Sequence, residues 1–393
     1  MIHCIILKDM HYSNTLYKVI KMYKNYLLML LIFICSSVLY SSNTLSINHD
    51  YISKIRGCIL GAVVGDMLGG PVEFIQDPDD ISKKYLRNDS LDISLLPYVT
   101  TKSGRRIIPY TDDTGMTLCV LKGICNWHNS YNKEHSIIYT IACEFVNDLN
   151  NTLGWAQPSR APGNACLKNV RKLASVLKQG NSDHDTSLFS QGKPLWMVGG
   201  AMDGGCGSVM RAHPFSLLYF QNPTKAAFYS RLQSTITHAA PIAIAACESF
   251  AIGIAHAMNS TISPQQIARS MIDRAQVTDP STAQLLEQAL MYAQNPEKYD
   301  STVVFKQLLG WAAHEALAAG LYCFLRYPYD MKRAITLAVI TPGDSDSIAT
   351  IAGALVGAYN GQGCLPGDWL EYIENKEEIE NLIEQFSTYC VVH

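Results

Sequence analysis

Apolar residues recur at spacings of three and four through most of the chain beyond residue 50, which is the period of a helix that buries one face. Stretches of alternating apolar and polar residues, the pattern of a half-buried strand, are few. The pattern therefore predicts an all-α protein with one domain over residues 51–393. Helices are expected from Ser53 to Pro71 and from Met116 to Ile124, over about 135–150, 165–177, 241–258, 280–294, 310–326, 330–340 and 345–361, after the cap Ser263–Pro264, and over 367–387 as an amphipathic closing helix. Residues 75–109 are charged and irregular, and they are expected to form a long loop or an insertion.

Two of the predicted helices carry small residues at every fourth position. These positions are Gly57, Gly61, Gly65 and Gly69 in the first helix, and Ala349, Gly353, Gly357 and Gly361 in the second. A glycine inside a helix costs about 1 kcal/mol relative to alanine, so a repeated glycine needs a compensating role. Close approach of another backbone is such a role. We predict that the two helices pack backbone to backbone, which would bring their ends together.

Acidic residues gather where two of the predicted helices begin. After the turn residues Pro342 and Gly343, the second small-residue helix opens with Asp344 and Asp346 between hydroxyl residues. A helix cap is the commoner explanation, but a cap needs one such residue rather than four in a row. The same character recurs at residues 111–113, before the helix that contains Met116. No Lys or Arg lies within 341–361, so a metal ion is the natural partner for these charges.

The donor atoms of the two acidic stretches are all oxygen. Such a set suits Mg²⁺, Mn²⁺ or Ca²⁺ and disfavours zinc. Four carboxylates exceed the charge of one divalent ion, which favours two ions, and two ions roughly 3.5–4 Å apart can hold a substrate oxygen and activate a water. Two further acids, Asp66 and Glu73, lie near the carboxyl end of the first small-residue helix, where the helix dipole disfavours them. The candidate ligands are Thr111, Asp112, Asp113, Asp344, Asp346 and Ser347.

Composition narrows the candidate partners. With 393 residues, 48% of them hydrophobic, the chain can bury a large core. Its net charge of −3 argues against nucleic acid as an electrostatic partner, so an anionic ligand must be met by local groups. The segment 198–211 supplies five glycines and Arg211, a combination that can approach a phosphate, although a glycine-rich loop alone is a weak signal. The twelve scattered cysteines contain no CxxC pair and are expected to be reduced core residues.

The first 50 residues differ from the rest. Lys18, Lys21 and Lys24 precede an apolar run over residues 26–40, and a polar linker follows over 41–50. This order resembles a signal peptide, although a buried helix or a short membrane anchor fits nearly as well. We therefore expect this segment to contact a membrane or to direct secretion, whereas the cysteine usage favours a reducing compartment.

Six motifs follow one another along the chain: GCILGAVVGDMLGGPVEF (57–74), YTDDT (110–114), RAPGNACL (160–167), GGCGSVMR (204–211), ITHAAP (236–241) and TPGDSDSIATIAGALVGAYNG (341–361). In this order they resemble the motifs of the ADP-ribosylglycohydrolases, a family that includes ADP-ribosylarginine and ADP-ribosylserine hydrolases. The resemblance runs through nearly all of residues 53–385. It implies a compact orthogonal bundle of helices with two Mg²⁺ or Mn²⁺ ions that acts on ADP-ribosylated protein or a small ADP-ribose conjugate. We expect the protein to be a monomer.

Carried over position by position, the resemblance assigns the metal ligands to the six candidates named above. Ser347 stands where the family usually has Thr, and Pro342 where Gly is common. Glu73 matches a glutamate that is catalytic or gating in the serine-specific members. The resemblance implies catalytic roles for Glu73, Asp112, Asp113 and Asp346. The implied ADP-ribose-binding residues are Arg160, Gly163, Asn164, Gly205, Gly207, Ser208, Met210, Arg211 and His238, with Arg211 and His238 expected at the pyrophosphate.

Two other functions remain compatible with these residues. One is a catalytically weak ADP-ribose binder, or a structural protein like the eye-lens crystallins that resemble the family. Such a protein would be expected to lose metal-binding acids, and this chain keeps all four. The other is a different two-metal hydrolase, for example one that cleaves phosphoesters. The sequence also leaves open whether the bond cleaved is to arginine, serine, a polymer or an O-acetyl group.

Overall fold

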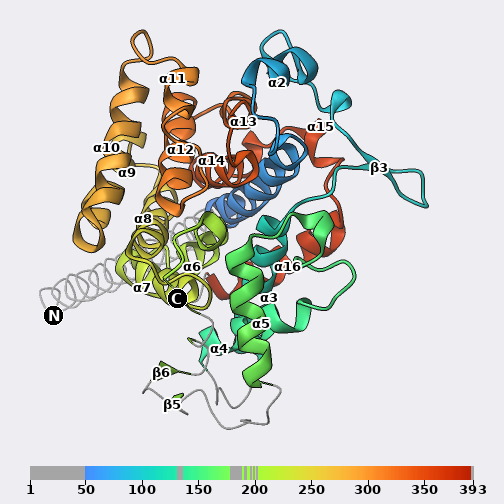
Figure 1. The fold of residues 1–393 in the computed structure, drawn as a ribbon, viewed down its shortest axis with the longest axis vertical. Coiled ribbons are helices and arrows are strands. Elements are labelled where there is room, and N and C mark those ends of the chain that lie inside the picture. Colours follow the sequence, from blue (N-terminus) through green and yellow to red (C-terminus); the bar gives the residue numbers. More distant parts are fainter. Residues whose placement is uncertain are drawn as a thin grey trace, which may run out of the picture. The chain divides into compact units, whose positions relative to one another are not determined.

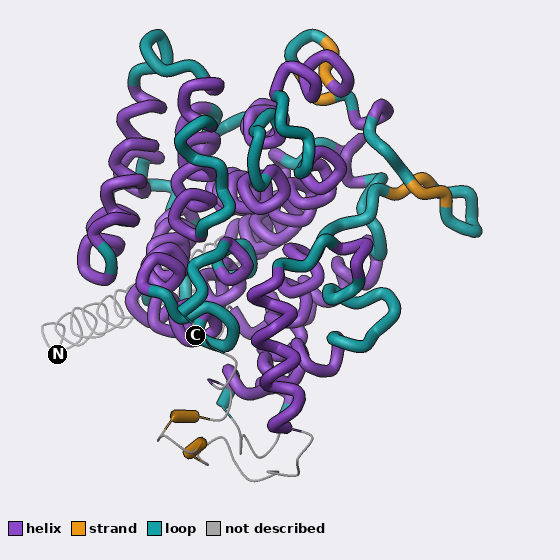
Figure 2. Tube along the Cα trace, viewed as in Figure 1, coloured by secondary structure: helices purple, strands orange, loops and turns teal. Residues whose placement is uncertain are grey.

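Helices make up almost all of the regular structure in this computed structural model, which describes residues 49–130, 136–177 and 202–390 together with 188–189, 193–194, 197 and 200 (Figures 1 and 2). The prediction of an all-α fold is confirmed. Residues 51–393 make up one compact unit. The apolar segment 26–40, for which we expected membrane contact, lies outside the described residues.

The chain is helical over residues 49–69 and continues into the short 3₁₀ turn η1, Gly70–Val72. This stretch is long and apolar enough to span a membrane, but 83% of its most apolar window is buried within the protein. It therefore serves here as a core helix.

The segment 75–109 is more ordered than expected. It forms helix α2 (Pro78–Tyr85), the paired strands β1 (Leu86–Arg87) and β2 (Ser90–Leu91), the turn η2 (Ile93–Leu95), and a second pair, β3 (Val99–Thr100) and β4 (Arg106–Ile107). The side chain of Asp77 caps α2 at its Asp79 amide, and α2 buries Ile81 and Tyr85. Of the two alternatives, the long loop is wrong because this Asp-Pro start signal outweighs the charged composition, and an insertion with elements of its own agrees with the structure.

The other predicted helices are present in the predicted order, whereas the helices over His213–Leu218, Pro223–Ser234 and Ser301–Phe305 were not predicted from the sequence. The closing helix is interrupted, however, because Asn375 takes a left-handed φ of 51° between α15 and α16. The helices are α3 (Asp112–Asn129), α4 (Ile137–Asp148), α5 (Asn164–Leu177), α6 (His213–Leu218), α7 (Pro223–Ser234), α8 (Pro241–Ala257), α9 (Pro264–Thr278), α10 (Pro280–Gln294), α11 (Ser301–Phe305), α12 (Ala313–Arg326), α13 (Met331–Val339), α14 (Ser345–Asn360), α15 (Gly367–Leu370) and α16 (Lys376–Cys390). Short 3₁₀ turns η3 (Pro158–Arg160), η5 (Cys206–Ser208) and η6 (Gln362–Cys364), and the strands β5 (Leu188–Phe189) and β6 (Lys193–Pro194), complete the described elements.

The two small-residue helices pack against each other, as predicted, and they run in opposite directions. A Cβ added at Gly57 would lie 2.5 Å from the Gly357 carbonyl oxygen, and one added at Gly69 would lie 2.5 Å from the Cα of Asp346. Side chains at these positions are excluded because the obstacle is the backbone of α14. The blue helix and α14 accordingly run side by side in Figure 1. This contact places residue 69 at the start of α14.

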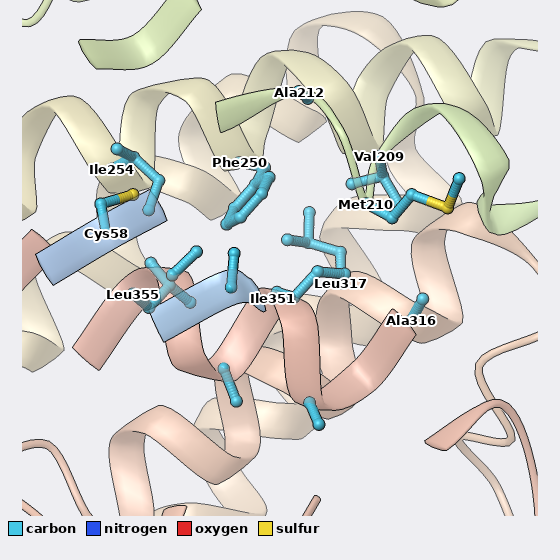
Figure 3. Close-up of a cluster of buried hydrophobic side chains, with 14 of the residues drawn as sticks. Cys58, Val209, Met210, Ala212, Phe250, Ile254, Ala316, Leu317, Ile351 and Leu355 are labelled. Atoms are coloured by element: carbon cyan, nitrogen blue, oxygen red, sulfur yellow. The ribbon is translucent and has the colours of Figure 1, made fainter. Parts of the chain in front are cut away.

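The core is built around α14 and its neighbours α8, α12 and α13. Figure 3 shows Phe250 and Ile254 of α8 facing Leu317 of α12 and Ile351 and Leu355 of α14, all fully buried. Interiors of this kind resist displacement, because close-packed side chains leave little space to move into. The amino-terminal end of α14 is therefore held in a fixed position.

Candidate functional site

The site is built at the amino-terminal ends of α3 and α14. The hydroxyl of Thr111 caps α3 by accepting from the Asp113 amide at 3.2 Å, and the Asp344 carboxylate caps α14 by accepting from the Ser347 amide at 3.2 Å. The simple explanation for these residues, helix capping, is thus correct for Thr111 and Asp344. It leaves Asp112 and Asp113 without that role, whereas the Asp346 carboxylate also accepts from the Ser347 amide, at 2.9 Å.

Contacts with the first helix hold the two caps close together. The Ser345 hydroxyl donates to the Gly69 carbonyl at 2.9 Å, directly beside the small-residue contact. The Asp66 carboxylate accepts from the amides of Thr111 at 2.9 Å and Thr114 at 2.8 Å. Asp66 therefore does not face the cavity but fixes the start of α3, and its apparent misplacement at a helix end has a structural explanation.

Five carboxylates line a cavity of about 220 Å³. One oxygen from each of Glu73, Asp344 and Asp346 lies within 4.8 Å of the others, and the Ser347 hydroxyl is 3.4 Å from Asp113 Oδ1. Of the six predicted ligands, the cavity is lined by Asp112, Asp113, Asp344, Asp346 and Ser347. Thr111 does not line this cavity but a neighbouring one of about 410 Å³.

The cavity is electrostatically unbalanced as it stands. No Lys or Arg is among the described residues that line it. Burial, followed by repulsion from Asp346, raises the pKa of Asp112, Asp113 and Asp344 well above the ordinary value and that of Glu73 to about 10. Two of the carboxylate oxygens, Asp113 Oδ2 and Glu73 Oε2, are buried without any hydrogen-bond partner. A divalent cation in the cavity would coordinate these buried, unpartnered carboxylate oxygens. The residues that line the cavity therefore fit such an ion.

The glycine-rich loop forms the opposite wall. Gly205, Gly207 and Met210 line the cavity, as does His238. A Cβ at Gly207 would lie 2.6 Å from Cys166 Sγ and 3.1 Å from His238 Cε1, so a side chain here would have to displace these two residues. Burial and the nearby Arg211 lower the pKa of His238 to about 3, which keeps this imidazole neutral, and its Nδ1 lies 2.8 Å from the Thr237 hydroxyl.

Arg211 does not reach the cavity, which corrects the expectation that it contacts a pyrophosphate. The side chain is fully buried behind the loop, where it donates to the Gly207 carbonyl, to Gln233 Oε1 at 3.1 Å and to Thr237 Oγ1 at 2.6 Å. It braces the loop from behind. Ser208 is also turned away, because its hydroxyl accepts from that of Ser234 at 2.9 Å.

In the segment 160–164, too, some residues face the cavity and one points away from it. Gly163 and Asn164 line the cavity, and the Gly163 amide hydrogen-bonds the Asp112 carboxylate. Arg160 is turned away from it. Its guanidinium pairs with both oxygens of Glu374, at 2.6 and 3.0 Å, and donates to the Tyr110 carbonyl at 2.7 Å. Arg160 therefore supports the approach to residues 111–113 and is not placed to touch a ligand.

Several lining residues were not identified from the sequence. Cys166 and Cys206 were treated as ordinary core cysteines, yet Cys206 Sγ lies 2.8 Å from Asp344 Oδ2 within the cavity. Trp311, which is 45% exposed, also lines the cavity, and its carbonyl accepts from the Cys206 amide at 3.2 Å. The close acidic neighbours of Cys206 come from distant parts of the chain, so no local pattern signals them.

The fold and the site define the class to which the molecule belongs: an all-α protein whose cavity is walled by carboxylates at two helix starts and by a glycine-rich loop. Comparison with known proteins then identifies the family. The model of the ADP-ribosylglycohydrolase family matches residues 47–392. The chain belongs to the ADP-ribosylglycohydrolase family, and it is a hydrolase.

Relatives of known name agree with this assignment. "ADP-ribosylhydrolase ARH3" of Danio rerio is 26% identical over 369 residues, covering 86% of this chain and 92% of the relative. The protein of the same name from Homo sapiens is 24% identical, covering 85% and 92%. "ADP-ribosylarginine hydrolase Tri1" of Serratia proteamaculans is 23% identical, covering 86% and 79%. A solved structure titled "ADP-ribosylglycohydrolase-related protein complex" has the same fold, with a TM-score of 0.62 and 22% identity over 87% of this chain and 99% of that one.

Proposed function

We propose that this chain is a metal-dependent hydrolase that cleaves the glycosidic bond between ADP-ribose and a protein side chain or related conjugate, releasing ADP-ribose. The observation that carries the proposal is the cavity of five carboxylates, two of them with unpartnered buried oxygens, in a member of this family. The names of the relatives support the ADP-ribose part of the proposal but do not agree on one linkage.

Two Mg²⁺ or Mn²⁺ ions are the proposed cofactors, held by Asp112, Asp113, Asp344, Asp346 and Ser347. When bound, they would offset the negative charge, orient the ribose hydroxyls and lower the pKa of a water. Thr111 would contribute by holding the Asp113 backbone, since its hydroxyl accepts from that amide. These roles account for the concentration of acids at two helix starts.

The chain's own groups position the rest of the substrate. Gly205 and Gly207 leave the backbone of the loop open to the cavity, and their amides are the proposed donors to the pyrophosphate. The neutral His238 adds no charge but presents its ring on the same wall. Arg211 acts indirectly, because it fixes the Gly207 carbonyl and therefore the course of the loop.

Glu73 is proposed to handle the proton of the departing group. It borders two cavities, the one described above and another of about 410 Å³ that Phe74, Tyr98 and Ala161 also line. Bond cleavage at an anomeric carbon needs an acid near the leaving atom and a water on the ribose side. We place the conjugated side chain in the second cavity, so that Glu73 stands between sugar and leaving group.

The test is to incubate the protein with peptides ADP-ribosylated on arginine or on serine, with Mg²⁺ or with a chelator, and to measure released ADP-ribose. Release that depends on Mg²⁺ and is lost in Asp344→Asn supports the proposal, and the peptide that is cleaved identifies the linkage. Binding of ADP-ribose without any release would instead support a binding protein. Hydrolysis of a phosphomonoester but of neither peptide would support a different two-metal hydrolase.

A further inference from the structure

Cys206 places a sulfur atom among the oxygen donors of the acidic cavity. Its Sγ lies 2.8 Å from Asp344 Oδ2, to which the thiol donates. Ten cysteines of the described residues are free, and most are buried among apolar side chains. Cys166 and Cys206 both line the carboxylate cavity, and Cys206 differs in that its thiol lies against a carboxylate.

The backbone fixes the direction of this side chain. Cys206 opens the turn η5, its amide donates to the Trp311 carbonyl at 3.2 Å, and its carbonyl accepts from the Val209 amide at 2.9 Å. Gly205 and Gly207 on either side bring the backbone to the cavity wall. The thiol therefore points at the acids as a consequence of the loop's course.

A second observation concerns Asp113, which lines the same cavity. Its Oδ2 is buried and has no hydrogen-bond partner, and the residue is only 2% exposed. The Ser347 hydroxyl donates to the other oxygen, Asp113 Oδ1, at 3.4 Å. One thiol and several carboxylates thus converge on the same cavity. Oxygen donors alone suit Mg²⁺ and Mn²⁺, but a sulfur donor adds affinity for soft cations.

We propose that the acidic cavity also binds a thiophilic divalent cation, such as Cd²⁺ or Zn²⁺, through Cys206 Sγ together with the Asp344 carboxylate. On binding, the thiol loses its proton to solvent and the sulfur coordinates the cation as thiolate. The soft cation occupies the place of the hard one and so competes with Mg²⁺. This inference rests on the metal-binding half of the proposed function and does not depend on which bond is hydrolysed.

The experiment is a titration of the metal-free protein with Cd²⁺, followed by thiolate-to-Cd²⁺ charge-transfer absorption in the ultraviolet and by calorimetry. The variants are Cys206→Ser and, as the matched control, Cys166→Ser. Cys166 lines the same cavity, but its thiol contacts the Gly207 carbonyl at 3.8 Å and Arg211 rather than a carboxylate. Circular dichroism checks that both variants are folded.

The parent protein and Cys166→Ser should show the charge-transfer absorption. Cys206→Ser should lose the part of this absorption that comes from the Cys206 thiolate. Cd²⁺ affinity in Cys206→Ser should fall by at least about tenfold, the lower end of the loss seen when even an outer partner of a metal ligand is removed. A third test requires no substitution: in the parent protein, excess Mg²⁺ should suppress the absorption.

Three results would overturn the inference: an undiminished band in Cys206→Ser, a band in the parent that Mg²⁺ leaves unchanged, or no band in the parent at all. The calorimetry separates this failure from that of the proposed function. If Mg²⁺ binds and Cd²⁺ does not, the role of Cys206 alone is refuted. If neither ion binds, the metal dependence of the enzyme is refuted with it.

Discussion

The substitutions Gly57→Ala and Gly69→Ala test how the site is assembled. Each one introduces a similar steric clash with the partner helix, but at opposite ends of the same helix contact. In each case the new Cβ would lie 2.5 Å from the backbone of α14, at the Gly357 carbonyl or at the Cα of Asp346. Ordinary contact begins at 3.4 Å, so the helices must separate by about 0.9 Å at either point. The two positions are about 18 Å apart along the helix, at 1.5 Å per residue.

Both substitutions should destabilise the protein by a similar amount. Overpacking costs about 1–3 kcal/mol, and the upper end applies because a helix backbone cannot turn aside as a side chain can. Alanine recovers about 1 kcal/mol of helix propensity, which leaves a net loss of about 2 kcal/mol. With an unfolding entropy of about 2.1 cal/mol/K per residue, this unit should lose only about 3 °C in Tm. Urea unfolding is therefore the better measurement, with Gly367→Ala as the control, since nothing lies within 4 Å of its Cβ position.

Metal binding should distinguish the two variants. The new side chain in Gly69→Ala displaces the backbone of Asp346, which is a proposed metal ligand. Because ligand distances in metal sites vary by only about 0.2 Å, this displacement should lower the Mg²⁺ affinity at least about tenfold. Gly57→Ala acts at the far end and should leave Mg²⁺ affinity within about twofold of the parent, because additivity holds for sites this far apart. The reasoning is refuted if either variant is as stable as the parent, or if both lose Mg²⁺ affinity equally.

Three further predictions concern single charged groups. Asp344→Asn should abolish Mg²⁺ binding by calorimetry while raising the Tm of the metal-free protein, because one of several mutually repelling charges is removed; a lower Tm would contradict this. Arg211→Ala should cost about 3–5 kcal/mol in urea unfolding, since it removes the donor to Gln233 Oε1 and opens a buried space, and a stable variant with weakened ADP-ribose binding would instead return Arg211 to the ligand. The metal-free protein should lose stability as pH rises from about 4, because the pKa of Asp66 is raised to about 6 and that of Glu73 to about 10, so that the unfolded chain releases these protons first. Scanning calorimetry from pH 4 to 8 measures it, and a Tm that rises over this range would contradict it.

The elements that the sequence predicted best are those with a strong local signal. The spacing of Gly57 to Gly69 and of Ala349 to Gly361 predicted a helix contact that the structure confirms. The acids at 111–113 and 344–346 predicted two helix starts in one place, which also holds. Each of these signals lies within a few consecutive turns of one helix, so reading them requires no knowledge of the rest of the fold.

The features that could not be predicted from the sequence are those that depend on which way a side chain points in the folded protein. Arg211 and Ser208 belong to the same loop as Gly205 and Gly207, but only tertiary packing decides that the polar pair faces Gln233 and Ser234. Cys206 looked like any other cysteine because Asp344 is 138 residues away. The Asp77-Pro78 start of α2 was a readable signal, and the weight given to charged composition obscured it.

The contact between the first helix and α14 has a consequence for how the chain is made. The Gly69 carbonyl and the Ser345 hydroxyl that donates to it are 276 residues apart in the sequence. At a synthesis rate of about 5–20 residues per second, α14 is therefore made roughly 15–55 s after the first helix. During this time the glycine face of the first helix lies open, and a chaperone or another apolar segment can occupy it. The order also keeps Asp112 and Asp113 away from Asp344 and Asp346 until nearly all of the core has been synthesised. Bringing the carboxylates together is thus left to the last stage of folding, when the packing of the finished core can oppose their repulsion.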